Sequence, residues 1–169
     1  MTIRQEEQRD YEEVYQLVKK AFETAEESDG TEQDLVTALR NSESFVPELS
    51  LVAVEDGKII GQILFSKIMI GGREELALAP LSVHPKWQKK GIGLALMAKG
   101  HEAAGKLGYD YAVVLGHAEY YPKAGYVPAG RYGIKAPFDV PDENFMAVRL
   151  NDKAENLNGT VQYDKAFGI

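Results

Sequence analysis

The segment Glu74–Val83 (EELALAPLSV) constrains the fold more than any other part of the chain. Beyond its two glutamates, this segment has apolar residues on both faces of an extended strand. Such a strand has to be covered on both sides, which places it in the middle of a sheet. Pro80 has no backbone donor, so it predicts a bulge or a missing ladder bond there. The fold is therefore expected to be layered around this strand.

Two helices and two strands are predicted ahead of the central strand. Apolar residues at helical spacing predict an amphipathic helix over Glu7–Ala25. A threonine followed three residues later by an acid caps a second helix, from Thr31 to about Asn41. Strands then follow over Glu48–Glu55 and Lys58–Ile70, and the Asp56-Gly57 turn signal joins them into a hairpin.

The second half of the chain alternates helices and strands. The predicted elements are a helix over Gly91–Leu107, a strand over Tyr109–Leu115, a short helix over Glu119–Ala124, a return strand from Gly125-Tyr126, a strand over Asn144–Leu150 and an edge element over Val161–Phe167. This order predicts an α+β fold with a mixed sheet and a central helix packed on one face. The length of 169 residues and 44% hydrophobic composition suit one domain spanning residues 1–169.

Composition excludes several classes of function. The formal net charge of -7 disfavours nucleic acid and acidic membranes as partners. The absence of cysteine excludes disulfides, thiolate metal sites and cysteine nucleophiles, and no other metal site is expected. The polar N-terminus is not a signal peptide, and no apolar run approaches the ~20 residues that span a bilayer. We therefore expect a cytoplasmic protein.

The stretch HPKWQKKGIG (His84–Gly93) carries the most distinctive chemistry. It places Gly91 and Gly93 at the mouth of the predicted central helix, where free N–H groups and the helix dipole attract anions. The spacing is compatible with a diphosphate cradle, and equally with a surface loop of solvated lysines. A nucleic-acid patch with Trp87 as a stacking platform is disfavoured by the net charge. Neither the P-loop nor the GxGxxG fingerprint is present.

Two motifs in this region resemble those of a known family. Gln88-Lys-Lys-Gly91-Ile-Gly93 is similar to the Q/R-x-x-G-x-G/A signature of the GNAT superfamily of N-acetyltransferases, and LSVHP before it resembles the end of that family's central strand. The segment Tyr120–Tyr126 (YYPKAGY) resembles the Y-Y-x-x-x-G-F/Y segment that closes the family's acetyl-CoA site. The sequence around this segment, VVLGHAEYYPKAGY, is most similar to the YhbS-like bacterial branch of the family.

The resemblance implies a fold and a cofactor. The fold is a GNAT-type mixed, mostly antiparallel central sheet with helices on both faces and a splayed central strand pair. The co-substrate is acetyl-CoA, and the cofactor-binding residues it implies are Leu81, Ser82, Val83, Gln88, Lys89, Lys90, Gly91, Ile92, Gly93, Leu94 and Tyr121. The N–H of Leu81 would polarise the thioester carbonyl. Tyr121 would protonate the departing thiolate, and its alternative role is packing against the sheet.

The residue that deprotonates the acceptor is left open by the sequence. Some relatives carry a glutamate where this chain has Ala77. Glu75, on the same strand face, and Glu119, after the next strand, are the candidate catalytic bases, with His117 as a further alternative. A mechanism without a dedicated base is also open. Many relatives have an asparagine after the strand that ends at Leu115, and this chain has Gly116 there.

The expected function is acetyl transfer from acetyl-CoA directly to a primary amine on a small molecule or peptide. The alternative is a non-catalytic acyl-CoA-binding or sensing protein on the same fold. A homodimer is a further expectation. Acidic residues between the first two helices either line the acceptor cleft or form a solvated face; they are Glu23, Glu26, Glu27 and Asp29.

Overall fold

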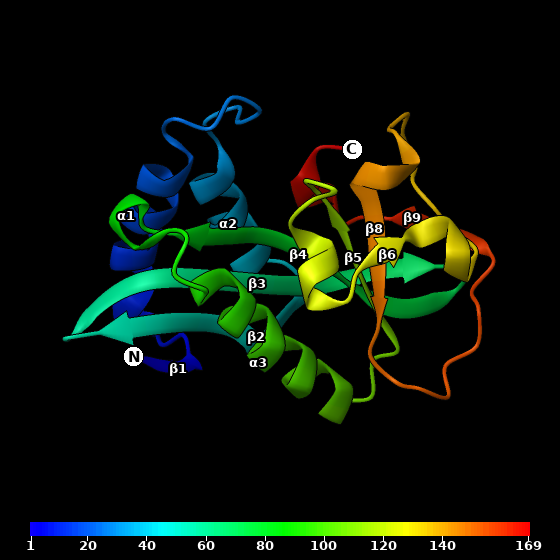
Figure 1. Cartoon of the computed structure of the whole chain (residues 1–169), viewed down its shortest axis with the longest axis horizontal. Helices are drawn as coiled ribbons and strands as arrows, with labels where there is room; N and C mark the ends of the chain where they lie inside the picture. Colours follow the sequence, from blue (N-terminus) through cyan, green and yellow to red (C-terminus); the bar gives the residue numbers. More distant parts are fainter.

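The computed structural model describes residues 1–169 and is built on a nine-stranded sheet (Figure 1). The strands are β1 (Thr2–Gln5), β2 (Phe45–Glu55), β3 (Lys58–Ile70), β4 (Arg73–Val83), β5 (Tyr111–Leu115), β6 (Val127–Pro128), β7 (Ile134–Lys135), β8 (Phe145–Arg149) and β9 (Gly159–Gln162). Their order is β1-β2-β3-β4-β5-β8-β6, with β9 joining β3 to β7. In the main path only β4 and β5 are parallel, so the predicted mixed, mostly antiparallel sheet is confirmed.

Three helices cover the two faces of the sheet. They are α1 (Tyr11–Phe22), α2 (Glu32–Arg40) and α3 (Ile92–Lys106). Figure 1 shows α3 crossing in front of β2 and β3, with α1 and α2 behind them. Six short 3₁₀ segments complete the chain: η1 (Gln8–Asp10), η2 (Pro85–Trp87), η3 (Tyr121–Ala124), η4 (Ala129–Tyr132), η5 (Asp142–Asn144) and η6 (Lys165–Phe167).

Alternation along β3 explains why both faces are filled. Ile63 and Phe65 point into the cluster beneath α3, while Leu64 between them points into the cluster beneath α1 and α2. A third cluster lies over β4, β5 and β8 and is closed by η4, β7 and β9. The central strand is covered on both faces, as its apolar pattern predicts, and α3 packs on one side as expected.

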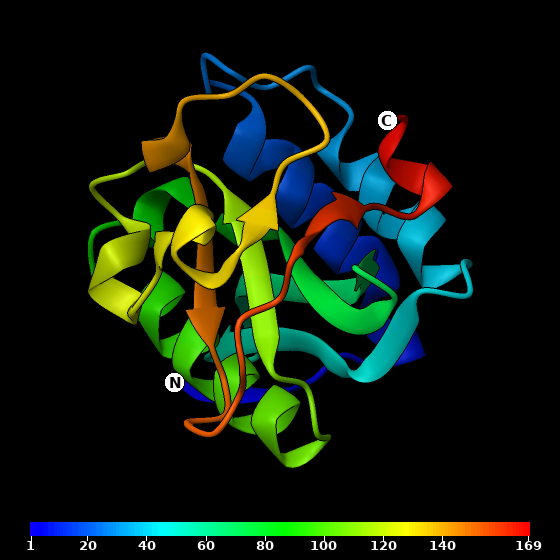
Figure 2. The ribbon, with the colours of Figure 1, turned by 90° about the vertical axis from the view of Figure 1, so that its right-hand side faces the viewer.

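The C-terminal segment closes the molecule on the α2 side. Figure 2 shows it (red) passing β9 and ending beside α2. Ser44, just before β2, donates a hydrogen bond of 2.7 Å to Asp164, which anchors this end. No helix of the chain combines the length and the apolar character of a membrane span.

The differences from the predicted elements lie at the short or irregular segments. The first helix is shorter than Glu7–Ala25, because its first turn is η1 and α1 ends at Phe22. The edge element predicted over Val161–Phe167 is β9 followed by η6. Strands β1, β6, β7 and β9 hold two to four residues each, which is too few for an alternating pattern to stand out.

The central strand pair opens in the middle of the sheet. Strands β4 and β5 pair only at Leu76–Ala112 and Ala77–Val113. Just beyond, β4 bulges, because Leu64 of β3 faces both Ala79 and Pro80. The bulge predicted from Pro80 is confirmed. The remainder of β4 has no partner on its β5 side, so the splayed pair expected from the resemblance is also confirmed.

Candidate functional site

The opening between β4 and β5 contains a cavity of about 570 Å³. Its walls are the free edge of β4, the start of α3 and the segment around η3. The lining residues are Leu81, Val83, Trp87, Gln88, Lys89, Gly91, Ile92, Gly93, Leu94, Tyr120, Tyr121 and Lys123. The cavity thus brings together the two motifs that the sequence places more than 25 residues apart.

The β4 wall presents unpaired backbone groups. The N–H of His84 donates to the Ile60 carbonyl at 2.8 Å, so it points toward β3. Because successive residues of a strand point their backbone groups to opposite sides, those of Leu81 and Val83 point away from β3, into the opening. The Val83 carbonyl accepts a bond of 3.2 Å from the Gln88 side-chain amide. The N–H of Leu81 therefore faces the cavity as a donor for a ligand.

The α3 wall presents the positive N-terminal end of a helix to the cavity. Gly91, the N-cap, has a left-handed backbone (φ 82°) that favours glycine, and its carbonyl accepts the first helical bond, from Ala95 at 3.0 Å. The N–H groups of the first turn have no partner within the helix, and the helix dipole makes this end positive. Lys89, also left-handed (φ 63°), adds a charge at the lip.

The third wall is a column of aromatic rings. Tyr120 packs edge-on against Tyr121 with centroids 5.1 Å apart, and Tyr121 packs the same way against Tyr126 at 5.8 Å. The Tyr126 hydroxyl and the His101 ring nitrogen Nε2 are hydrogen-bonded at 2.9 Å, which ties the column to α3.

Burial controls the protonation of these rings. It raises the pKa of Tyr121 to about 12, with a smaller contribution from Tyr120, and it raises that of Tyr126 well above its usual value. Burial also lowers the pKa of His101 to about 4. At neutral pH the tyrosines are therefore protonated and His101 is neutral. Tyr121 therefore carries its proton at the edge of the cavity.

The glycine after β5 makes room for Tyr121. A Cβ added to Gly116 would overlap Cε2 of the Tyr121 ring. The resemblance implies an asparagine at this point, and here the tyrosine ring occupies the space that its side chain would need. The departure from the family pattern therefore has a packing explanation.

Two expected cofactor residues do not line the cavity. The side chain of Ser82 points to the α1 face of the sheet, where it is 1% exposed and has no hydrogen-bond partner. Strand alternation between Leu81 and Val83 requires this. Lys90 extends over the Trp87 ring, with its Nζ 5.1 Å from the ring centroid. Both side chains therefore lie outside the cavity lining.

Three residues of the cavity wall are not among the cofactor-binding residues expected from the sequence: Tyr120, Trp87 and Lys123. The doubled tyrosine was the available signal for Tyr120. The others have none, because their position depends on how η2 and η3 face each other across the opening.

The structure places both carboxylate candidates for the base outside the cavity lining. Glu75 is 1% exposed at the closed end of the strand pair, where Oε1 accepts bonds from the N–H groups of Asp110 (2.9 Å) and Tyr111 (3.1 Å). It precedes Leu81 by six residues, about 20 Å of extended strand. Glu75 therefore joins β4 to β5. Glu119 is exposed on the turn before η3 and, like His117, does not line the cavity.

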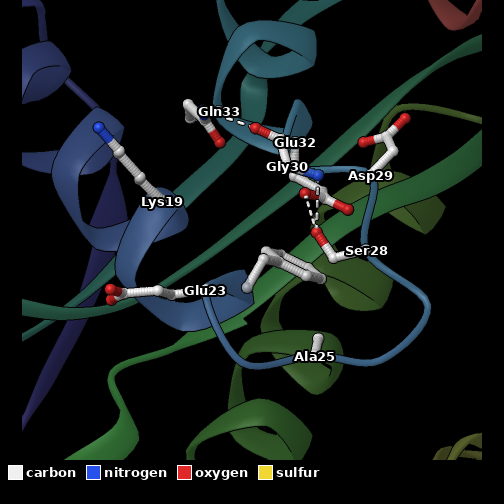
Figure 3. A pocket seen from close by; sticks show the side chains of 9 residues that line it. Lys19, Glu23, Ala25, Ser28, Asp29, Gly30, Glu32 and Gln33 are labelled. Atoms are coloured by element: carbon white, nitrogen blue, oxygen red, sulfur yellow. Dashed lines mark hydrogen bonds between the residues drawn. The ribbon is translucent and has the colours of Figure 1, made fainter.

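A second, acidic hollow of about 410 Å³ lies between α1 and α2 (Figure 3). Figure 3 shows Lys19 and Glu23 on one side of it and Asp29 on the other. Ser28 donates a bond of 2.6 Å to the Glu32 carboxylate within this loop. Of the acidic residues singled out in the sequence, Glu23 and Asp29 line this hollow and Glu26 and Glu27 do not.

Comparison with known proteins agrees with this geometry. The model of the acetyltransferase (GNAT) family matches residues 11–126. The uncharacterized N-acetyltransferase YjhQ of Escherichia coli K12 is 38% identical over 139 residues, which cover 78% of this chain and 77% of YjhQ.

Two solved structures match almost the whole chain. The crystal structure of the GNAT family N-acetyltransferase YhbS from Escherichia coli, in complex with CoA, has a TM-score of 0.90 at 27% identity and covers 99% of this chain and 92% of YhbS. A GNAT family acetyltransferase from Brucella melitensis, in complex with acetyl-CoA, has a TM-score of 0.81 at 32% identity, covering 98% and 97%.

Proposed function

Because this chain belongs to the GNAT family of acetyltransferases, we propose that it transfers an acetyl group from acetyl-CoA directly to a primary amine. One observation carries the proposal. A single cavity joins a free strand edge, an unpaired helix N-terminus and a protonated tyrosine. Two proteins of similar fold have been solved in complex with CoA and with acetyl-CoA, which supports the same donor here.

Each wall of the cavity has a task in this proposal. The N–H groups of the first turn of α3, with Lys89, hold the diphosphate. The main chain of Leu81 and Val83 pairs with the pantetheine arm as a further strand would. The Leu81 N–H donates to the thioester carbonyl oxygen and stabilises the negative charge that develops there when the amine attacks.

Tyr121 supplies the proton that the leaving group needs. As the amine nitrogen bonds to the acetyl carbon and the carbon–sulfur bond breaks, the Tyr121 hydroxyl protonates the departing thiolate. The new amide nitrogen gives up one proton to solvent, and solvent returns a proton to the Tyr121 oxygen. The residues lining the cavity include no carboxylate and no histidine. The amine therefore attacks as its free base, having lost its proton to solvent, and kcat/KM should rise with pH until the free amine predominates.

The proposal is tested by incubating the purified protein with acetyl-CoA and a panel of primary amines. Thiol release should depend on one class of amine, and mass spectrometry should find the acetylated amine. Acetyl-CoA binding without turnover on any amine would favour the alternative, a non-catalytic acyl-CoA-binding protein. A protein that binds no CoA would contradict both. The homodimer stays a prediction, which light scattering would measure.

A further inference from the structure

Tyr120 and Gly93 interlock across the cavity. A Cβ added to Gly93 would overlap the hydroxyl oxygen of Tyr120, and it would lie 3.4 Å from Cζ of the same ring and 3.6 Å from Cδ2 of Leu81. The tyrosine hydroxyl therefore rests against the first turn of α3, in the space that any other residue at position 93 would fill. This contact joins all three walls of the cavity.

The Tyr120 hydroxyl makes no hydrogen bond within the protein. Four other tyrosine hydroxyls do, namely those of Tyr15, Tyr109, Tyr111 and Tyr126. Burial raises the pKa of Tyr120, so its hydroxyl keeps its proton at neutral pH. Its ring is held from behind by Tyr121. A donor without a partner is thus held beside the N–H groups of the helix N-terminus, where an anion would accept from both.

We propose that Tyr120 is a cofactor-binding residue whose hydroxyl donates to the diphosphate held on the first turn of α3. The inference rests on the proposed function and extends it. The two adjacent tyrosines then have separate tasks: Tyr120 binds the phosphate end of the cofactor, and Tyr121 serves the thioester end. Position 93 is glycine because the Tyr120 hydroxyl occupies the space that a side chain there would fill.

The test compares CoA with pantetheine, which lacks the diphosphate. Isothermal titration should show CoA binding to Tyr120→Phe roughly ten- to a hundredfold more weakly than to the wild type, because a hydrogen bond to a charged group is lost. Pantetheine should bind both proteins equally. In the acetyl transfer assay the KM for acetyl-CoA should rise while kcat changes little.

Tyr163→Phe is the matched control. The Tyr163 hydroxyl also makes no hydrogen bond, and its ring is stacked on Phe138 away from the cavity. This variant should bind CoA as the wild type does. Equal CoA affinity of the wild type and Tyr120→Phe would overturn the proposal, as would tighter binding by the variant, which would make Tyr120 an obstruction. A wild type that binds no CoA would instead refute the proposed function.

Discussion

The contact between Tyr120 and Gly93 predicts that Gly93→Ala lowers the free energy of unfolding when residue 120 is tyrosine and raises it when residue 120 is phenylalanine. In the wild type, Gly93→Ala places a methyl group on the Tyr120 hydroxyl. Displacing the ring or the helix should cost about 1–3 kcal/mol, as overpacking does. Alanine gains back at most ~1 kcal/mol of helix propensity over glycine. The free energy of unfolding should therefore fall.

In a Tyr120→Phe background the same substitution should stabilise the protein. Without the hydroxyl, the nearest ring atom is Cζ at 3.4 Å from the new methyl, an ordinary contact. Only the propensity gain of up to ~1 kcal/mol remains. The double-mutant cycle should give a coupling of about 1–3 kcal/mol between the two positions, or a few degrees of Tm in a chain of this size.

Urea denaturation of the four proteins without cofactor measures the cycle. Gly100→Ala, on the same helix as Gly93, is the control, because its Cβ would overlap the Phe65 ring of β3 and no change at Tyr120 relieves that clash. It should destabilise both backgrounds equally. An effect of Gly93→Ala that is the same with Tyr120 and with Phe at position 120 would refute the contact and remove the structural basis for the role of Tyr120.

Three further predictions follow from buried groups. Tyr121→Phe should lower kcat in thiol release by roughly 10²–10⁴-fold, the range of general acid catalysis; an unchanged kcat across the pH range would rule out its role as the acid. Burial holds the pKa of His101 at about 4, below its ordinary 6.5, so the unfolded chain binds the proton more readily and stability is lost as pH falls from about 6.5 toward 4. Between pH 7 and 4.5 this loss of unfolding free energy is roughly 2–3 kcal/mol. Urea denaturation of His101→Gln should not show the loss. The same pH dependence in the variant and the wild type would contradict the lowered pKa of His101. Gln62 is fully buried with both amide atoms unpaired, so Gln62→Leu should keep or raise the free energy of unfolding, and a fall of more than ~1 kcal/mol would show that these atoms are satisfied.

The central strand, the hairpin before it and the glycine-containing loop that opens α3 were all predictable from local chemistry. The apolar run of β4, the Asp56-Gly57 turn and the glycines opening α3 each act through residues close in the chain. Hydrophobic alternation, turn geometry and helix capping are properties of such short segments. The sequence by itself therefore determined the element order, the place of the bulge and the glycines that open α3.

Only the tertiary structure decided which side chains meet at the site. Glu75 lies on the strand face expected of a base, but it stands beside the point where β4 pairs with β5. Its carboxylate there accepts a hydrogen bond from the backbone ahead of β5. Ser82 lies between two cavity residues and faces away from the cavity. Tyr120 touches Gly93 because the splayed strands let η3 fold back onto α3. Such contacts depend on the pairing register of strands and on how β4 and β5 splay apart. Both properties involve segments far apart in the chain, so no local sequence pattern encodes them.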